Sequence, residues 1–395
     1  MARRQKYEID SVNVHARTVW CILLGPACLA AACSEGESES VTVGARNGIR
    51  TAIVWRLAED LRVGSIDGSG PDVFGSIRDV FPAVDGGLWI LDSQAHELRL
   101  FNEAGQIQRI VGGPGEGPGE FAGNTCAFPG PEGEAWVEDG LARWQRFDSQ
   151  GDLIGQLRST SNIGCGIRRW TPDGRFFVVR TAFDPETREP GGYFLVHRLS
   201  PSGELSPGDT IPLPTVAPIP TVTWVAPGRR MSLPLPFVQR ARFILGPLGT
   251  FWISDGGGSY SIRRQDEQGE VILTVQRDYQ PVTIPEAERA LAIQEFAPDG
   301  WTAEDGFDPD QVPRAYPPFD SYSIGTDGTL WVRRTGLGGA AALDAFATDG
   351  TFLGEVEVPG YFDRFSIRYA TPDHLYGVLR DEFDVPFAVR FSVVR

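Results

Sequence analysis

Asp85-Gly86-Gly87-Leu88-Trp89-Ile90 joins a tight turn to an apolar strand centred on an aromatic residue. Asp-Gly is favoured in two-residue hairpin turns, because glycine reaches positive φ without steric cost. The apolar and aromatic residues that follow favour a strand. The same order of turn and strand occurs five more times, at residues 132–137, 173–178, 248–253, 327–332 and 372–377. The chain is therefore organised by a repeat.

A second short strand follows each of the first five turns. Leu98-Arg99-Leu100-Phe101, for example, alternates over four residues and runs into a loop closed by Gly105. This pattern indicates a strand, a hairpin and a further strand. The turn glycines or their equivalents fall at 86, 133, 174, 249, 328 and 373, and three of the gaps are 47, 41 and 45 residues, the length of a four-stranded propeller blade. We expect an all-β fold, a six-bladed β-propeller over residues 51–395.

The sixth repeat ends near Phe391, with no room for its last strand. The segment Ile53-Val54-Trp55-Arg56-Leu57, or the stretch after it to Ile66, is a strand with no blade of its own. We expect this N-terminal strand to close the last blade, which removes an exposed sheet edge.

Two gaps in the repeat, 75 and 79 residues long, each contain an insertion. The first, at about 212–237, carries seven prolines and is interpreted as an extended excursion rather than a strand. The second, at about 281–318, opens with a capping box, Thr283 and Glu286, which predicts a short helix ending near Phe296. An acidic, proline-rich loop follows. We expect both insertions on a propeller face, where loops commonly form binding surfaces.

The first 33 residues have the pattern of an export signal. Four basic residues precede an uncharged run, Thr18 to Ala32, which is too short to span a bilayer but has the length of a signal-peptide core. Leu29-Ala30-Ala31-Ala32-Cys33 resembles the lipobox of bacterial lipoproteins, although Ala stands where the family has Leu three residues before the Cys. The resemblance implies a signal peptide at 1–32, a lipid on Cys33 and a flexible polar tether at 33–50. An ordinary signal peptide with a chance Cys is the alternative, and the long charged segment leaves the translation start open.

Removal of residues 1–32 would take away four basic and two acidic residues, leaving 32 arginines against 50 Asp and Glu, a net charge of −18. The only lysine, Lys6, would leave with the signal, which excludes a lysine Schiff base or lysine general base in the mature chain. Binding of nucleic acid through a broad basic surface is not expected at this charge.

Cys126 and Cys165 are the cysteines that remain beside Cys33, because Cys21 and Cys28 leave with the signal. Two cysteines in an exported domain most often pair, and their spacing matches no zinc-site pattern. We expect a disulfide. The alternative is two separately buried thiols, because the sequence does not show whether their Cα atoms lie close enough.

The first repeat resembles NHL-type propeller repeats and the six-bladed propeller lipoproteins of bacteria. The resemblance rests on Leu88-Trp89-Ile90-Leu91-Asp92, on Leu98–Phe101 and on the glycine-rich run Gly112–Phe121. It implies the fold and no particular reaction. The glycine-rich run lacks the Gly-Lys-Ser/Thr ending of a phosphate-binding loop and is interpreted as the link between two blades.

One column of charged residues ends the aromatic strand in successive repeats. Its members are Asp92, Asp139, Arg180, Asp255 and Arg334. Equivalent positions of a propeller come together around one axis, so these residues could form a polar ligand-binding face or a calcium site with oxygen ligands. Alternatively, each Asp caps the turn after its own strand by accepting bonds from backbone N–H groups.

Enzymes on six-bladed propellers include lactonases and amidating lyases, which use a bound metal. The mature chain has only His96, His197 and His374, and none shows a ligand spacing. We therefore assign no catalytic residue and no metal ligand. The prediction is a monomeric, non-catalytic propeller without a cofactor, lipid-anchored at the cell envelope, facing the periplasm or the surface, and binding a protein, peptide or glycan. The alternative is a calcium-dependent hydrolase or lyase of the lactonase or amidating-lyase type.

Overall fold

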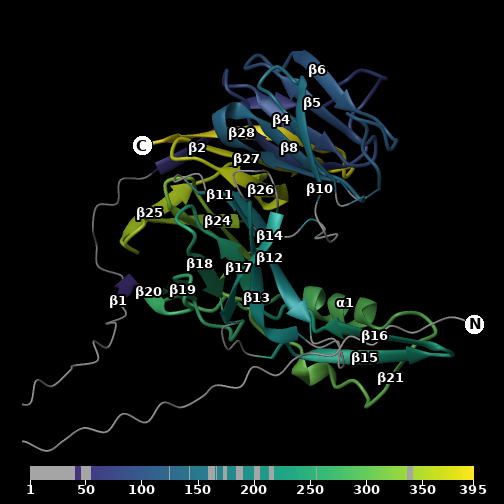
Figure 1. Cartoon of the computed structure of the whole chain (residues 1–395). Coiled ribbons are helices and arrows are strands. Elements are labelled where there is room, and N and C mark those ends of the chain that lie inside the picture. Colours follow the sequence, from purple (N-terminus) through teal and green to yellow (C-terminus); the bar gives the residue numbers. More distant parts are fainter. Residues whose placement is uncertain are drawn as a thin grey trace, which may run out of the picture. The chain divides into compact units, whose positions relative to one another are not determined.

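Figure 1 shows the computed structural model of the chain. It describes the backbone of residues 41–45 and 55–395, apart from 124, 142, 159–164, 166, 172–175, 184–189, 200–204, 213–217, 255 and 336–340. Within the strands, the side chains at 41–45, 158, 167–168, 178–183, 190–199, 205–212 and 335 are also outside the description. The predicted signal peptide at 1–32 and the predicted lipid site, Cys33, lie outside the described residues. No helix in the described part is long and apolar enough to cross a membrane.

The repeats of the N-terminal half form antiparallel sheets of four consecutive strands. The first sheet has the order β3 (Ile77–Pro82), β4 (Leu88–Asp92), β5 (Glu97–Phe101) and β6 (Ile107–Gly112). The second contains β7 (Cys126–Pro129), β8 (Ala135–Glu138), β9 (Arg143–Phe147) and β10 (Leu153–Arg158). The third contains β11 (Ile167–Trp170), β12 (Phe176–Phe183), β13 (Pro190–Leu199) and β14 (Leu205–Pro212).

The later repeats form further sheets of the same kind. One contains β17 (Arg242–Leu245), β18 (Phe251–Ser254), β19 (Ser261–Gln265) and β20 (Val271–Arg277). The next contains β22 (Ser321–Ile324), β23 (Leu330–Thr335), β24 (Ala341–Phe346) and β25 (Phe352–Glu357). The last set contains β26 (Phe365–Ala370), β27 (His374–Arg380) and β28 (Pro386–Val394), and a strand from the N-terminal side of the chain joins this set to the preceding four strands in one eight-stranded sheet.

The turn between β3 and β4 shows why the first repeat has two glycines. Gly86 has a φ of 74°, which L-residues with a Cβ rarely adopt. A Cβ on Gly87 would lie 1.9 Å from the carbonyl oxygen of Phe101, closer than any real contact. The first glycine therefore allows the turn, and the second allows the backbone of β5 to approach.

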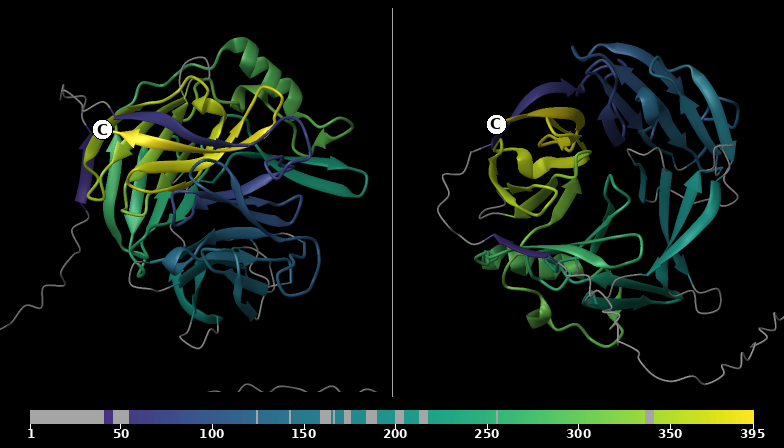
Figure 2. Two further views of the ribbon diagram at one scale, coloured as in Figure 1. Left: turned by 90° about the horizontal axis from the view of Figure 1, so that it is seen from above. Right: turned by 60° about the vertical axis from the view of Figure 1, so that its left-hand side comes forward.

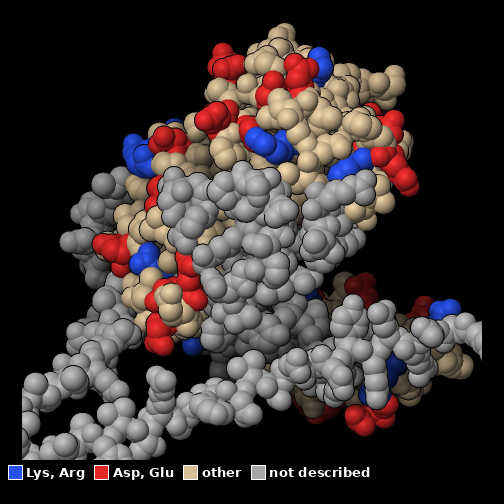
Figure 3. All heavy atoms as spheres, viewed as in Figure 1, with Lys and Arg blue, Asp and Glu red and all other residues tan. Residues whose placement is uncertain are grey.

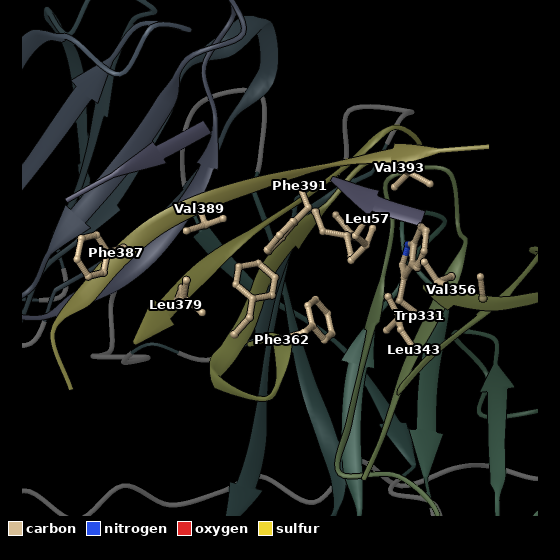
Figure 4. Close-up of a cluster of buried hydrophobic side chains, with 14 residues drawn as sticks. Leu57, Trp331, Leu343, Val356, Phe362, Leu379, Phe387, Val389, Phe391 and Val393 are labelled. Atoms are coloured by element: carbon tan, nitrogen blue, oxygen red, sulfur yellow. The ribbon is translucent and has the colours of Figure 1, made fainter. Parts of the chain in front are cut away.

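The strand β2 (Trp55–Val63) joins the last two sheets. It runs antiparallel to β28, with Leu57 opposite Val393, and so completes the sheet of β26, β27 and β28. At its start it also runs parallel to β25, with Trp55 opposite Val356. Figure 4 shows Leu57 among side chains from both sheets, and Leu57 is only 3% exposed.

A further strand, β1 (Val41–Ala45), adds to the outer edge of β20 in parallel register. The sequence analysis places these residues in the polar tether. Part of that segment thus pairs with a sheet that is far from it in the sequence. The Val-Thr-Val composition of β1 is typical of a strand and was the signal for this pairing.

The aromatic residue of each repeat is buried. These residues are Trp89, Trp136, Phe177, Trp252, Trp331 and Tyr376, with exposures between 0% and 5%. Neighbouring sheets share the core, because single hydrophobic clusters contain side chains from the first and second sheets, the second and third, the sheets of β18 and β23, and the last and first sheets. The sheets therefore pack face to face in sequence order, and the last sheet packs on the first.

The two insertions pack on each other. The hairpin of β15 (Thr221–Ala226) and β16 (Arg229–Pro234) pairs with β21 (Thr302–Ala303) from the second insertion. Trp224, which is 3% exposed, lies in one apolar cluster with Phe296 and Phe307 of the second insertion. The two insertions thus form one accessory module, whose hairpin and helix are labelled in Figure 1.

The first insertion corrects the sequence analysis, which interpreted it as extended chain without a strand. Most of its prolines lie outside the paired residues of the hairpin, while Thr221–Trp224 alternates as a strand does. Pro227 and Gly228 lie in the turn, where Gly228 has a φ of 70°. Pro-Gly is favoured at the centre of a tight turn, so the prolines delimit the hairpin instead of preventing it.

The predicted helix is present, but its predicted cap is not. Helix α1 spans Glu286–Phe296, with Pro285 at the N-cap and no side-chain cap. Thr283 instead forms an isolated antiparallel bridge with Ala315. Thr283 lies two residues before the N-cap, and no side chain caps the helix, so the expectation of a capping box was wrong.

Candidate functional site

The first strand of each four-stranded sheet lines one central cavity of about 760 Å³. Its walls come from β3, β7, β11, β17, β22 and β26. These strands are spread along the sequence, so in Figure 2 their colours run from purple to yellow. Among these strands, β3 contacts β7 and β26, and β17 contacts β11 and β22. A cavity of this volume is in the range that holds small ligands.

Arginines dominate the charge of the cavity. Arg78 of β3, Arg169 of β11, Arg242 of β17 and Arg368 of β26 line it, and Asp79 is the one carboxylate in the described lining. Over the whole chain, Asp and Glu outnumber Lys and Arg by 52 to 36. Figure 3 shows acidic and basic side chains mixed over one described face. The cavity therefore reverses the charge balance of the chain.

Two of these arginines lie at β-bulges. The pairing of β3 with β4 passes from Ile77 to Asp79 and skips Arg78. The pairing of β26 with β27 passes from Ile367 to Tyr369 and skips Arg368. A bulge interrupts the regular alternation of side chains and can redirect one of them toward a site. The lining includes four consecutive residues of β3 and of β26, as it also does of β7, whose pairing with β8 is regular.

Arg169 is bonded to two other sheets. It donates hydrogen bonds to the carbonyl oxygens of Leu245 and Ile324, both at 3.0 Å. Burial lowers the pKa of its guanidinium, and the nearby Tyr369 opposes this shift. Within the described part of the chain, Arg169 forms no ion pair. Backbone carbonyl dipoles thus hold its charge without neutralising it.

Tyrosines and a disulfide complete the wall. Burial raises the pKa of Tyr369, and the charge of Arg169 opposes that shift, so the hydroxyl is protonated at neutral pH. Tyr322 donates hydrogen bonds to the carbonyl oxygens of Arg242 and Trp252, at 2.7 and 2.9 Å. Cys126 and Cys165, both lining residues, form a disulfide with their Cα atoms 5.8 Å apart. The wall is cross-linked between β7 and the segment before β11.

The charged column proposed from the sequence does not line this cavity at its described positions. The carboxylate of Asp92 is buried and accepts bonds from the N–H groups of Gly75, Ser76, Gln94 and Ala95, at 2.9 to 3.2 Å. This is the capping arrangement, extended to the loop before β3. The carboxylate of Asp92 therefore bonds the backbone around its own sheet and does not contribute to the cavity.

Asp139 is held by an arginine. Arg143 donates from Nε and Nη2 to its Oδ2, at 2.9 and 2.6 Å. Arg143 also donates to the carbonyl oxygens of Glu116, Gly117 and Glu120. The pair therefore fastens the glycine-rich link between the first two sheets.

Arg334 belongs to a buried ion-pair network. Its Nε lies 2.9 Å from Oδ2 of Asp344, as an ion pair rather than an aligned hydrogen bond, and its Nη2 lies 3.0 Å from Glu355. Arg277 contacts the same two carboxylates. Tyr260 donates to Asp344 at 2.7 Å, and burial followed by the charge of Asp344 raises the pKa of Tyr260. Arg334 is thus already paired.

The remaining two members of the column cannot be placed by their side chains. Arg180 lies in β12, with its side chain outside the described residues, and Asp255 is itself outside them. The structure does not bring Asp92, Asp139 and Arg334 together, because each is engaged in a separate local network.

None of the four cavity arginines, Arg78, Arg169, Arg242 and Arg368, was singled out from the sequence. Ser-Ile-Arg at 76–78 and 366–368 is no signal for them, because the same tripeptide occurs at 261–263 in β19, the third strand of its sheet. The strand pairing that places these arginines at the cavity cannot be seen in one strand.

The fold and cavity together define a class. Four-stranded antiparallel sheets pack face to face, and their first strands surround a common cavity, which is the arrangement of a β-propeller. No protein-family model matches the chain, and no curated protein matches it.

Similar solved structures include a protein from Bacteroides fragilis that is described as exported. It is 12% identical with a TM-score of 0.47, over 90% of this chain and 99% of that one. Virginiamycin B lyase from Staphylococcus aureus is 13% identical with a TM-score of 0.44, over 86% of this chain and 100% of that one. A gluconolactonase from Xanthomonas campestris is 12% identical with a TM-score of 0.38, over 85% and 98%. At these identities and scores, no inference about this chain rests on them.

Proposed function

We propose that this chain is a non-catalytic binding protein of the cell envelope, a six-bladed β-propeller that takes its ligand in the central cavity. The observation that carries the proposal is the cavity of about 760 Å³, whose walls come from the first strand of every four-stranded sheet. A ligand there would contact all the sheets at once. A small molecule, or the end of a peptide or glycan, fits such a space.

The count of six is part of the proposal. It treats each four-stranded meander as one blade and β2 as the strand that closes the last blade. Closure by the N-terminal strand protects an edge that would otherwise be open to pairing with another chain.

The envelope address rests on the sequence of residues 1–40. If Cys33 carries lipid, the full chain expressed in a bacterium should incorporate an alkyne-tagged palmitate, and Cys33→Ser should abolish incorporation. Labelling of Cys33→Ser equal to that of the unaltered chain would contradict the anchor.

A calcium-dependent hydrolase or lyase is the alternative from the sequence. Calcium takes six to eight oxygen ligands, most often from several carboxylates. The described lining of the cavity offers one carboxylate, Asp79, and no histidine. No group of three or more His, Cys, Asp or Glu in the described residues is placed to hold a metal. The described donors therefore do not fit a calcium centre in the cavity.

Two measurements test the proposal. In a thermal-shift screen of anionic, neutral and cationic small molecules, a ligand of the cavity should stabilise the full chain but not Ser323→Trp, which fills the cavity from β22. Ser366→Trp, an exposed change on β26 outside the lining, is the matched control and should keep the stabilisation. The proposal fails if every stabilising compound acts equally on Ser323→Trp. Elemental analysis that finds one tightly held calcium per chain would favour the enzyme instead.

A further inference from the structure

The charge of the central cavity is positive. Four arginines against one carboxylate leave a formal excess of three positive charges in the described lining. This excess stands inside a chain with a formal net charge of −16. A solvated surface of such a chain would place acids beside most arginines, as in the pairs of Arg109 with Asp152 and Arg230 with Glu304.

Arg242 and Arg368 are available to a ligand. Both are exposed, both line the cavity, and in the described part of the chain neither guanidinium forms a hydrogen bond or an ion pair. A guanidinium presents five N–H donors in a planar fork that matches a carboxylate or phosphate. Two such groups on different sheets could hold a ligand from two sides.

Arg169 adds a buried charge to these exposed ones. Two of its nitrogens bond backbone carbonyls, and no carboxylate of the described residues pairs with it. A buried charge is costly unless it is compensated, and an anion in the cavity would compensate it. The strand register places Arg169 and Arg242 at different heights along the cavity wall. Arg169 lies opposite the repeat aromatic Phe177. In β17 the residue opposite the repeat aromatic Trp252 is Ile244, and Arg242 lies two residues before it.

Arg368 lies at a β-bulge of β26, and Arg78 lies at a β-bulge of β3. β-bulges are frequent beside active sites.

We propose that the central cavity binds a small polyvalent organic anion through its carboxylate or phosphate groups, which Arg169, Arg242 and Arg368 hold. This inference rests on the proposed function, because it names the chemistry of the ligand that the cavity takes. It predicts affinity that falls as salt rises, since charge attraction provides much of the binding.

Calorimetric titration of the purified full chain with citrate, with pyrophosphate and with glucose tests the proposal. Citrate carries only carboxylates and pyrophosphate only phosphates, so the two separate the possible sources of the anion, while glucose is a neutral control. At least one anion should bind, and glucose should bind more weakly. Failure of both anions to bind overturns the inference.

The double variant Arg242→Ala/Arg368→Ala should lower the affinity for the anion by about tenfold or more, as expected for the loss of charged hydrogen bonds. Arg56→Ala/Arg364→Ala removes two exposed arginines outside the lining, so it changes the net charge equally and should leave the affinity within about twofold. Equal weakening in both double variants would mean a general charge effect and would overturn the site. Unchanged melting temperatures would show that both variants fold; Arg169 stays in place because it bonds the backbone.

The inference and the proposed function can fail separately. If a neutral or cationic compound stabilises the chain and loses this effect in Ser323→Trp, the cavity is a binding site, and the inference that its ligand is an anion is wrong. If citrate or pyrophosphate binds with an affinity that depends on Arg242 and Arg368, the inference holds. If no compound of any charge loses its stabilising effect in Ser323→Trp, both proposals fail.

Discussion

At the residue scale, two buried carboxylates of this protein, Asp92 and Asp139, are each held within a network of several hydrogen bonds. Asp92 accepts four backbone N–H bonds, and Arg143 joins Asp139 to three carbonyl oxygens. The residue types indicated capping, because Asp after a strand commonly bonds the following turn. The arginine partner of Asp139 is four residues away in the chain, but the carbonyls it reaches are over twenty residues away. Only the fold shows those contacts.

Asp344→Ala should lower the free energy of unfolding by about 3–5 kcal/mol, the cost of leaving buried charges without their partner. Asp344 is fully buried, and Arg277, Arg334 and Tyr260 all contact it. Urea unfolding measures the change. Glu355→Ala is the matched control and should cost less than about 1 kcal/mol, because Glu355 is 57% exposed. Equal losses in the two variants would contradict the assignment of Asp344 as the centre of the network.

The same network predicts a dependence on pH. Burial alone would raise the pKa of Glu355, but the hydrogen bond from Arg277 and the charge of Arg334 lower it below 4.5. The folded chain therefore binds this proton more weakly than the unfolded chain. Glu355 contributes stability above pH 4.5 that is lost as pH falls through its folded pKa.

Glu355→Gln should accordingly show a shallower fall in the free energy of unfolding below pH 4.5 than the unaltered chain. The difference should be small, because solvent screens a carboxylate that is more than half exposed. If the free energies of unfolding of the two proteins fall in parallel across this pH range in denaturant titrations, the ion pairs of Glu355 with its arginines contribute no stability.

At the element scale, β2 holds two sheets together. It pairs along its length with β28 and at its start with β25, while its side chain Leu57 enters the cluster that contains Trp331 and Phe391. The sequence indicated that an N-terminal strand completes the last sheet, because that sheet lacked a strand. The second pairing, with β25, depends on how the two sheets lie together and has no signal in β2 itself.

Leu57→Ala should lower the free energy of unfolding by about 2–5 kcal/mol, as for other buried leucines that leave a cavity. Its neighbour Arg56 is exposed, and Arg56→Ala should change the stability by no more than about 0.5 kcal/mol. Thermal or urea unfolding of both variants provides the comparison. A loss for Arg56→Ala as large as for Leu57→Ala would mean that β2 stabilises the fold by pairing alone.

At the scale of the whole molecule, the two insertions leave the repeat and meet in one module. Trp224 of the first insertion packs on Phe296 and Phe307 of the second. Arg289 of α1 is buried and donates to the carbonyl oxygens of Pro309 and Val312. The module therefore has a small core of its own, separate from the clusters that the sheets share.

Trp224→Ala should increase amide hydrogen exchange in α1 and in β15 and β16, while the four-stranded sheets keep their protection. The reason is that the module's cluster contains no residue of the repeated sheets, so its opening need not open them. Exchange followed by mass spectrometry locates the change. Uniform loss of protection over the chain would show that the module and the sheets unfold as one unit.

The sequence by itself determined the strands of the repeat and their order. Asp-Gly turns, buried aromatics and short alternating strands act over a few residues, so they can be identified in the chain without its partners. Tertiary structure decided which residues face the central cavity. Arg78, Arg169, Arg242 and Arg368 are far apart in the sequence, and two of them lie at bulges in the pairing with a neighbouring strand. It also decided that Asp92 and Asp139 bond their own turns and the neighbouring loops, because the same carboxylate can serve a turn or a site according to which N–H groups lie near it.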